Sequence, residues 1–426
     1  MSVDSATRLA DLSATGSPVP IARADGSSAT AFDSRAAVAS RRQAAAPRAW
    51  RRRIGRAAGP QAEEAGAPTL VVLGGIHGNE PSGYLALERV FAALAADDSA
   101  LLGTLVGFGG NLQALEQGHR FLRHDLNRHW TPERVARLRA SEGPLEAEDA
   151  ELRLLDREIG RVLADAPGEV FGMDLHTTSG QGPCFTVLDD TLPNRAFAIR
   201  QPATLVVGLE EELAGTVTNF MALQGMRVYG FEAGQHDDPA SVDRAEAAIW
   251  VAMESAGVVE KGRPEVSVGR ELLEREAARL PHVVEVVYRH PVLPSDDFVM
   301  EPGYVNFQRI HGGEILARDR RGPVLACESG RILMPLYQPQ GEDGFFIVRP
   351  VARLWLSLSA LVRRLGLQRG LHLLPGVRRH PELPDTFVAD RRLTVFFASE
   401  LFHLLGYRRR GPAGRYLVMT RRPHDR

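Results

Sequence analysis

The sequence predicts an α/β fold, with a mixed, mostly parallel sheet flanked by helices and a smaller C-terminal all-β module. β-prone apolar runs alternate with helical patterns from residue 68 to about residue 256. Such alternation is typical of a largely parallel sheet covered by helices. From His282 onward, short alternating segments are separated by glycine-containing turns, which is the pattern of a compact all-β unit.

The composition is that of an ordinary globular protein. The chain has 426 residues, 44% hydrophobic and 24% charged, with a formal net charge of −2. These values exclude a wholly disordered chain, a collagen and a coiled coil, and they disfavour a nucleic-acid binder. Cys184 and Cys327 are too few for a disulfide framework and are compatible with a reducing compartment, so we expect a cytoplasmic protein. No apolar run is long enough for a transmembrane helix, and we expect no membrane partner.

The first unit of structure in the pattern is a strand followed by a turn and a helix. Residues 69–73 form a continuous apolar run, which predicts a strand buried on both faces. A glycine-rich turn at 74–81 leads into an amphipathic pattern at 82–96. Further strands are expected near 53–57 and at 101–108, 170–175 and 226–232, and further helices at 146–164 and from Pro239 to Ser255. Residues 206–213 fit either a strand or a helix.

The organisation of the chain divides into four parts. We expect a partly disordered leader (1–66), a catalytic domain (67–280), a β module (281–350) and an Arg-rich extension of unknown role (351–426). Within them, 263–279 has the polarity of a linker or insertion and is expected to be helical in its second half. The β module holds short strands including one at 303–307, and the extension holds helices at 354–365 and 394–405. The extension's arginines are interpreted as a solvated basic surface, with lipid, nucleic acid or a partner subunit as alternatives.

Two polar residues on the glycine-rich turn indicate a metal site. His77 and Glu80 lie three positions apart, so a tight turn can direct an imidazole and a carboxylate at one centre. A catalytic zinc takes such ligands and needs three from the protein plus an open position for water. His176, at the end of its own strand, is the natural third ligand, and Asp174 is placed to orient its ring. Taken alone, the His-Glu pair would be an ordinary structural feature.

Two further segments supply groups for acid–base chemistry and anion binding. Glu232 follows an apolar strand, where burial would raise the pKa of its carboxyl group and suit it to act as a general base; a salt-bridged or capping glutamate is the alternative. Residues 120–128 contain Arg120, Asn127 and Arg128. Arginines bind carboxylates bidentately and stabilise oxyanions, although a solvated basic loop has the same composition.

Three of these segments together resemble one known family. The motifs Gly-Ile-His-Gly-Asn-Glu (75–80), Asp-Leu-Asn-Arg (125–128) and Asp-Leu-His-Thr-Thr (174–178) resemble, in this order, the succinylglutamate desuccinylase/aspartoacylase family, a branch of the zinc carboxypeptidase fold. The resemblance covers about 66–256 and extends more weakly over the β module. It implies a zinc carboxypeptidase-like fold and hydrolysis of the amide bond of a small N-acyl amino acid.

The resemblance also implies a role for each site residue. One Zn²⁺ per chain would be held by His77, Glu80 and His176. By the same resemblance, Glu232 would be the general base, Arg120 would polarise the scissile carbonyl, and Asn127 and Arg128 would bind the carboxylate of the amino-acid part.

The sequence departs from the family pattern where the acyl group would bind. The residues that follow Thr178, beginning with Ser179, match no known substrate loop, and Tyr229, Arg227 and Tyr288 are only loose candidates for acyl binding. A metallocarboxypeptidase acting on a peptide C-terminus and a catalytically silent binding protein are the alternative functions. Oligomeric state, including a homo-oligomer, is left open.

Overall fold

The computed structural model describes residues 53–97, 101–390, 392, 405–409, 415–422 and 425. Most of the expected leader and nearly all of the helix expected at 394–405 lie outside these residues, and the expected domain boundaries stay predictions. None of the helices in the described part of the chain is long and apolar enough to cross a membrane.

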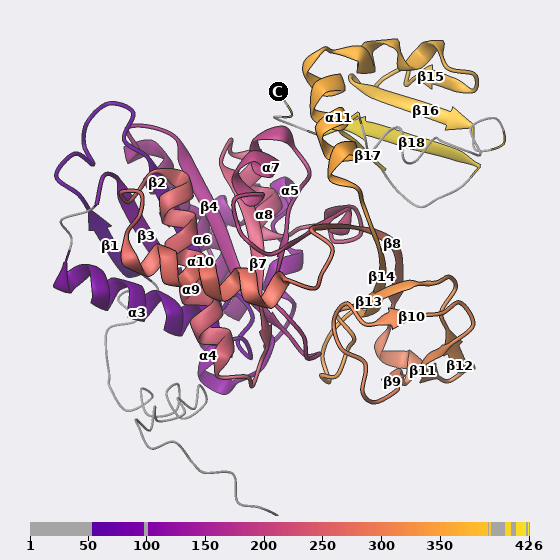
Figure 1. The fold of residues 1–426 in the computed structure, drawn as a ribbon, viewed down its shortest axis with the longest axis horizontal. Coiled ribbons are helices and arrows are strands. Elements are labelled where there is room, and N and C mark those ends of the chain that lie inside the picture. Colours follow the sequence, from indigo (N-terminus) through magenta and orange to yellow (C-terminus); the bar gives the residue numbers. More distant parts are fainter. Residues whose placement is uncertain are drawn as a thin grey trace, which may run out of the picture. The chain divides into compact units, whose positions relative to one another are not determined.

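A large mixed sheet forms the centre of the fold (Figure 1). Its 11 strands follow the order β1-β3-β2-β4-β7-β5-β6-β8-β14-β13-β10. The first seven in chain order are β1 (Arg53–Ala58), β2 (Thr69–Gly74), β3 (Thr104–Gly109), β4 (Val170–Thr178), β5 (Phe185–Val187), β6 (Thr204–Val207) and β7 (Arg227–Gln235). Strands β3, β2, β4 and β7 are parallel neighbours, so their carboxyl ends meet at one edge. The predicted α/β class is confirmed.

Helices cover both faces of this sheet, as the buried strands require. Along β2, Leu70 and Val72 pack into one apolar cluster, and Val71 and Leu73 into another. The first cluster includes residues of α3 (Ser82–Ala96), α7 (Leu192–Ala198), α9 (Ala240–Ala256) and α10 (Pro264–Ala277). The second includes residues of α5 (Pro132–Arg139), α6 (Ala147–Asp165) and α8 (Val217–Leu223). Side chains alternate between the faces of a strand, so a continuous apolar run needs two such layers.

Three local expectations need correction or completion. The segment with the polarity of a linker was expected to be helical in its second half only, and it is helical throughout as α10, which packs on α9 through buried residues that include Val266 and Leu273. Residues 303–307, expected to be a strand, lie in turns. The ambiguous stretch 206–213 contains the end of β6 and a short 3-10 helix, η2 (Leu209–Glu211).

The β module extends the main sheet. Strand β8 (Val283–Pro291) pairs with β6 in parallel and with β14 (Asp343–Pro350) antiparallel. The sheet ends with β13 (Gly330–Leu333) and β10 (Arg309–Ile310), while β9 (Val299–Met300), β11 (Ile315–Asp319) and β12 (Gly322–Leu325) form a separate three-stranded sheet. This continuity brings the start of β14 to the site described below.

The C-terminal extension contains a sheet that the sequence pattern did not predict. After α11 (Arg353–Arg364) and η4 (Leu367–Leu373), an antiparallel sheet has the order β15-β16-β18-β17. Its strands are β15 (Val377–Arg379), β16 (Thr386–Asp390), β17 (Tyr407–Arg409) and β18 (Tyr416–Arg421). The interpretation of the arginines as a solvated surface is wrong for Arg422: its side chain is 1% exposed and pairs with Asp189, Glu210 and Glu211.

Candidate metal centre and active site

The turn after β2 is shaped by glycines that allow close backbone contact. Gly75 has φ +74°, a conformation that favours glycine. A Cβ at Gly78 would lie 2.1 Å from the carbonyl carbon of Ala114, at the helix α4 (Leu112–Gln117). These two glycines let the chain turn from the end of β2 into α3, with His77 and Glu80 on the turn.

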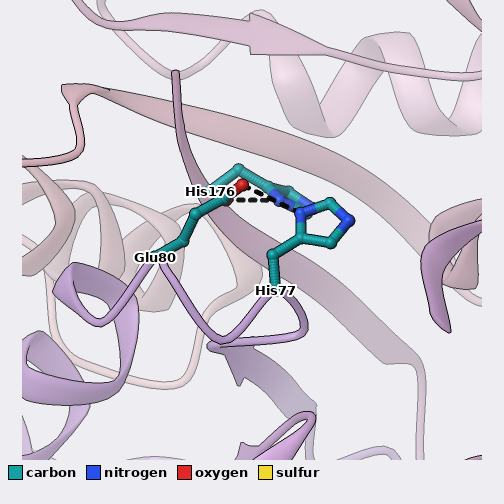
Figure 2. A group of neighbouring side chains, drawn as sticks. All are labelled: His77, Glu80 and His176. Atoms are coloured by element: carbon teal, nitrogen blue, oxygen red, sulfur yellow. Dashed lines mark hydrogen bonds and ion pairs between the residues drawn. The ribbon is translucent and has the colours of Figure 1, made fainter. Parts of the chain in front are cut away.

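Three side chains converge at the carboxyl ends of β2 and β4. Figure 2 shows the Glu80 carboxylate joined by dashed lines to the rings of His77 and His176. The Nδ1 atom of His77 lies 2.9 Å from Glu80 Oε1, and Nδ1 of His176 lies 3.0 Å from Glu80 Oε2. When one ligand atom is taken from each of the three residues, these atoms all lie within 4.8 Å of one another. The strands explain this meeting, because Gly74 of β2 pairs with Leu175 of β4 and His176 is the next residue.

The other nitrogen of each imidazole faces a second carboxylate. Nε2 of His77 lies 3.0 Å from Asp125 Oδ1, and Nε2 of His176 lies 2.7 Å from Asp174 Oδ2. When each Nε2–H donates to its aspartate, each Nδ1 keeps a lone pair directed toward the Glu80 carboxylate. Carboxylate–histidine pairs of this kind orient the histidine ligands of metal ions. The donor set of two imidazole nitrogens and one carboxylate therefore fits a zinc ion.

The charged side chains at the centre shift one another's pKa values. Burial opposes ionisation of Glu80, but His77 and the hydrogen bonds from both rings outweigh it and hold its pKa well below the usual range. Burial also disfavours the charged form of His176, yet Asp174 and Glu80 raise its pKa well above normal. The raised pKa of His176 favours positive charge beside the carboxylates, and a divalent cation at the Nδ1 atoms would supply such charge instead.

Arg120 lies against this centre. Its Nη1 donates to Glu80 Oε1 at 3.1 Å, and its Nε and Nη2 donate to Asp125 Oδ2 at 3.2 and 3.0 Å. Asp125 also faces His77, so one carboxylate fixes both the guanidinium and an imidazole. Burial opposes ionisation of Asp125, but His77 and Arg120 together keep its pKa well below normal. This arrangement fixes a cation at the edge of the centre.

Glu232 lies next to the centre, on the neighbouring strand. In the register of β4 and β7, His176 pairs with Glu232. The Glu232 side chain is buried, and its Oε2 atom has no hydrogen-bond partner among the described residues. Burial raises its pKa to about 7; Glu80 and Asp174 add to the rise and His176 opposes it. A carboxyl group with these properties is suited to take up and release a proton near neutral pH.

Asn127 and Arg128, the two residues expected to bind a substrate carboxylate, form hydrogen bonds with other residues of the protein. Both line the pocket that contains the metal centre. The Oδ1 of Asn127 accepts from the backbone N–H of Val217 at 2.8 Å, and its Nδ2 lies 3.2 Å from His176 Nε2. Arg128 donates from Nη2 to Asp343 Oδ2 at 3.1 Å. The seven site residues expected from the sequence therefore surround one pocket: His77, Glu80, Arg120, Asn127, Arg128, His176 and Glu232.

The loose candidates for acyl binding do not line this pocket. Tyr229 is fully buried and hydrogen-bonded to Gln201, Arg227 pairs with Glu169, and Tyr288 contacts His290 in the β module. For Tyr229 the reason is the strand period, because it lies three residues before Glu232 and points to the opposite face of β7.

The resemblance implied that the β module borders the cleft, but the sequence did not predict which of its residues line the pocket. Met334, Leu336, Gln338 and Asp343 line it. Gln338 accepts hydrogen bonds from Asn79 at 2.7 Å and lies 3.0 Å from His236 Nε2. Because these contacts join segments more than 100 residues apart, no local motif signals them.

The fold and site together define an α/β protein with a three-residue candidate metal centre at the carboxyl ends of parallel strands. Comparison with known proteins finds a family model that matches part of this chain. Residues 66–246 match the family model described as succinylglutamate desuccinylase/aspartoacylase catalytic domain, which confirms the resemblance carried by the three motifs.

Individual relatives agree with this match. A segment of 121 residues is 29% identical to a succinylglutamate desuccinylase from Paraburkholderia xenovorans, covering 28% of this chain and 34% of that protein. The aligned part thus spans about a third of the curated relative. The crystal structure of a succinylglutamate desuccinylase/aspartoacylase from Rhodobacter sphaeroides has 18% identity and a TM-score of 0.51, covering 71% of this chain and 96% of that one. This second likeness shows a shared fold.

Proposed function

We propose that this chain is a zinc-dependent hydrolase that cleaves the amide bond of a small N-acyl amino acid. One observation carries the proposal: His77, Glu80 and His176 direct ligand atoms at one centre while the buried carboxyl group of Glu232 lies beside His176. A metal centre with an adjacent proton acceptor is the arrangement that amide hydrolysis by water requires.

The residues that would hold the metal are His77 and His176 through Nδ1, and Glu80 through its carboxylate. When bound, the ion supplies Lewis-acid polarisation and lowers the pKa of water. Glu232 takes a proton from the attacking water and later gives it to the leaving nitrogen. Its free, buried Oε2 and its pKa of about 7 in the metal-free protein support both steps, because each needs a group that exchanges its proton easily.

Arg120 supplies a fixed positive charge to the carbonyl oxygen of the scissile amide. Glu80 and Asp125 hold its guanidinium on one side, so little reorganisation is needed when negative charge develops on that oxygen. Asn127 and Arg128 are proposed to contact the carboxylate of the amino-acid part.

The wall contributed by the β module supports a small substrate over a peptide. Met334, Leu336 and Asp343 line the same pocket as the proposed metal ligands, so a bound molecule would lie between those ligands and the β module. An extended peptide would have to leave the pocket past these side chains. Cytoplasmic residence and the oligomeric state remain predictions.

Two measurements test this proposal. Purified protein is analysed for metal by mass spectrometry, and zinc-loaded protein is assayed against N-acyl amino acids and against peptides with free C-termini. We expect about one zinc per chain and release of free amino acid from the acylated substrates only. Cleavage of peptides alone would favour the carboxypeptidase alternative, and zinc binding without hydrolysis of either class would favour the binding protein.

The ligand assignment has its own control. His176→Ala should lose zinc, whereas Arg320→Ala, which removes an exposed side chain of the β module, should retain it. Zinc retained at full occupancy by the His176 variant would contradict the proposed ligand set.

A further inference from the structure

Arg128, which is proposed to bind the substrate carboxylate, is already paired with a carboxylate of the protein. Asp343, at the start of β14, accepts from Arg128 Nη2 at 3.1 Å through Oδ2 and from Arg289 Nε at 2.6 Å through Oδ1. All three side chains are largely buried, with exposed fractions of 16%, 13% and 24% for Arg128, Asp343 and Arg289. Two guanidinium groups share one carboxylate, so this triad has a net charge of +1.

The second arginine of the pocket offers no additional free charge. Arg120 is paired with Glu80 and Asp125. Among the described residues that line the pocket, Arg120 and Arg128 are the two with an arginine or lysine side chain. Glu342 also lines the pocket and adds a negative charge, so apart from the metal centre the Arg128–Asp343–Arg289 triad is the source of positive charge that the described pocket residues offer a substrate. One carboxylate of the substrate balances it.

Hydroxyl and amide side chains, among them Thr178 and Gln338, line part of the remaining wall of the pocket. The other part is apolar and is formed by Val187, Leu209, Leu213, Met334 and Leu336. Four of these residues belong to one apolar cluster between the catalytic sheet and the β module: Val187, Leu209, Leu213 and Met334. A second anionic group placed against this wall would lose its hydration without gaining a partner, whereas an aliphatic group would be stabilised by burial.

We propose that Asp343 determines specificity by excluding dicarboxylates, and that the substrate is an N-acyl amino acid with one carboxylate and an uncharged, apolar side chain. This inference rests on the proposed function. Asp343 pairs with the arginines that a second carboxylate would need as partners, and its own negative charge repels that carboxylate. The single α-carboxylate still binds, because the triad retains one positive charge.

The test compares two substrates that differ in side-chain charge, N-acetyl-L-leucine and N-acetyl-L-glutamate. Zinc-loaded wild-type protein should favour the leucine derivative in kcat/KM by at least about 100-fold, the effect expected of a like-charge contact in a partly buried site. Asp343→Asn should reduce this preference at least about tenfold. Asp343→Glu, which retains the charge, should keep most of it. Asp297→Asn, an exposed carboxylate of the same module, should keep the wild-type ratio.

A binding measurement separates this inference from the proposed function. Calorimetry of zinc-loaded protein with free L-leucine and free L-glutamate should show the same preference and the same loss of preference in Asp343→Asn. If binding follows this pattern and no substrate is hydrolysed, the specificity assignment stands and the hydrolase proposal fails. If acyl amino acids are hydrolysed with an unchanged preference in Asp343→Asn, or with a preference for glutamate in the wild type, the assignment of Asp343 is overturned. Absence of both hydrolysis and binding would overturn both.

Discussion

Glu232 lies directly beside His176 in the register of the parallel strands β7 and β4. The sheet itself therefore sets the spacing between the proposed proton acceptor and a proposed metal ligand. The register is continuous from Phe171 to His176 along β4 and is fixed by buried side chains, so the relative position of these two residues does not depend on a flexible loop. This placement gives the first prediction.

Replacing Glu232 with glutamine should separate metal binding from catalysis. Glu232→Gln keeps the shape of the side chain and should retain zinc, but it cannot accept a proton, so turnover should fall at least about 100-fold. Metal analysis and steady-state kinetics on one preparation check both parts. Unchanged turnover with unchanged metal content would show that another group is the base.

The pH dependence of activity should report the same residue. A general base works only when deprotonated, so kcat/KM should rise with pH as the Glu232 carboxyl group ionises. Burial raises the pKa of this group to about 7 in the metal-free protein, and a divalent cation nearby would lower it, so the rise should fall at or below pH 7. The residual activity of Glu232→Gln should lack this acidic limb; its persistence would assign the limb to a different group.

Asp174 should control metal affinity through His176. Its side chain is fully buried and its Oδ2 lies 2.7 Å from the Nε2 of His176. Asp174→Asn should weaken zinc binding about 10- to 100-fold, the usual effect of removing a carboxylate that orients a histidine ligand. Competition with a zinc chelator gives the affinity. Asp243→Asn, an exposed carboxylate on α9, is the matched control and should bind zinc as the wild type does.

The sequence was most informative where local pattern decides structure. The run at 69–73 and the amphipathic pattern at 82–96 predicted β2 and α3 closely, because burial on two faces and helical periodicity are both local signals. The clustering of the three candidate metal ligands was also predictable, since His77 and Glu80 share one turn and His176 lies near the end of a recognisable strand. All three lie where parallel strands end, which is where α/β proteins place their sites.

The rest depended on contacts between distant segments. The pairing of Asp343 with Arg128 joins residues 215 positions apart, and no motif contains both. The first half of helix α10 was not predicted because its buried positions, Val266 and Gly269, are few among polar neighbours. The solvated interpretation of the extension failed for Arg422 because its acidic partners lie more than 200 residues earlier in the chain.

Asp190 should make the stability of the protein sensitive to acid. It is buried between Arg195 and Arg363, at 2.6 and 2.9 Å. Burial opposes its ionisation, but the two guanidinium groups outweigh this effect and hold its pKa well below normal. A carboxyl group with a lowered pKa in the folded state stabilises fully above its unfolded pKa of about 4 and loses that contribution as the pH falls further.

The measurement for Asp190 is urea unfolding at several pH values. Asp190→Asn should be less stable than the wild type at pH 7, and the difference should shrink between about pH 4 and pH 2. Asp297→Asn, which alters an exposed pair, should change the free energy of unfolding by no more than about 1 kcal/mol at any of these values. A constant deficit of Asp190→Asn across the whole range would show that its charge is not the stabilising feature.

Arg422 should hold the C-terminal extension against η2. Its guanidinium donates to Glu210 and Glu211 of η2 at 2.7 and 2.8 Å and to Asp189 at 3.2 Å. Arg422→Ala leaves these carboxylates in a buried site without that cation, and breaking a buried ion pair in this way costs about 3–5 kcal/mol. Arg320→Ala, which breaks an exposed pair, should cost no more than about 1 kcal/mol.

The loss in Arg422→Ala should also depend on pH, and like that of Asp190→Asn it should shrink as the pH falls, but over a higher pH range. Burial, opposed by Arg422, raises the pKa of Glu210 to about 7, and removing the arginine raises it further. A carboxyl group whose pKa is raised on folding is better tolerated when protonated, so the deficit should be larger at pH 8 than at pH 5.5. Urea unfolding at the two values checks this sign. A deficit that is equal at both would mean that Arg422 acts by packing and that its charge contributes little.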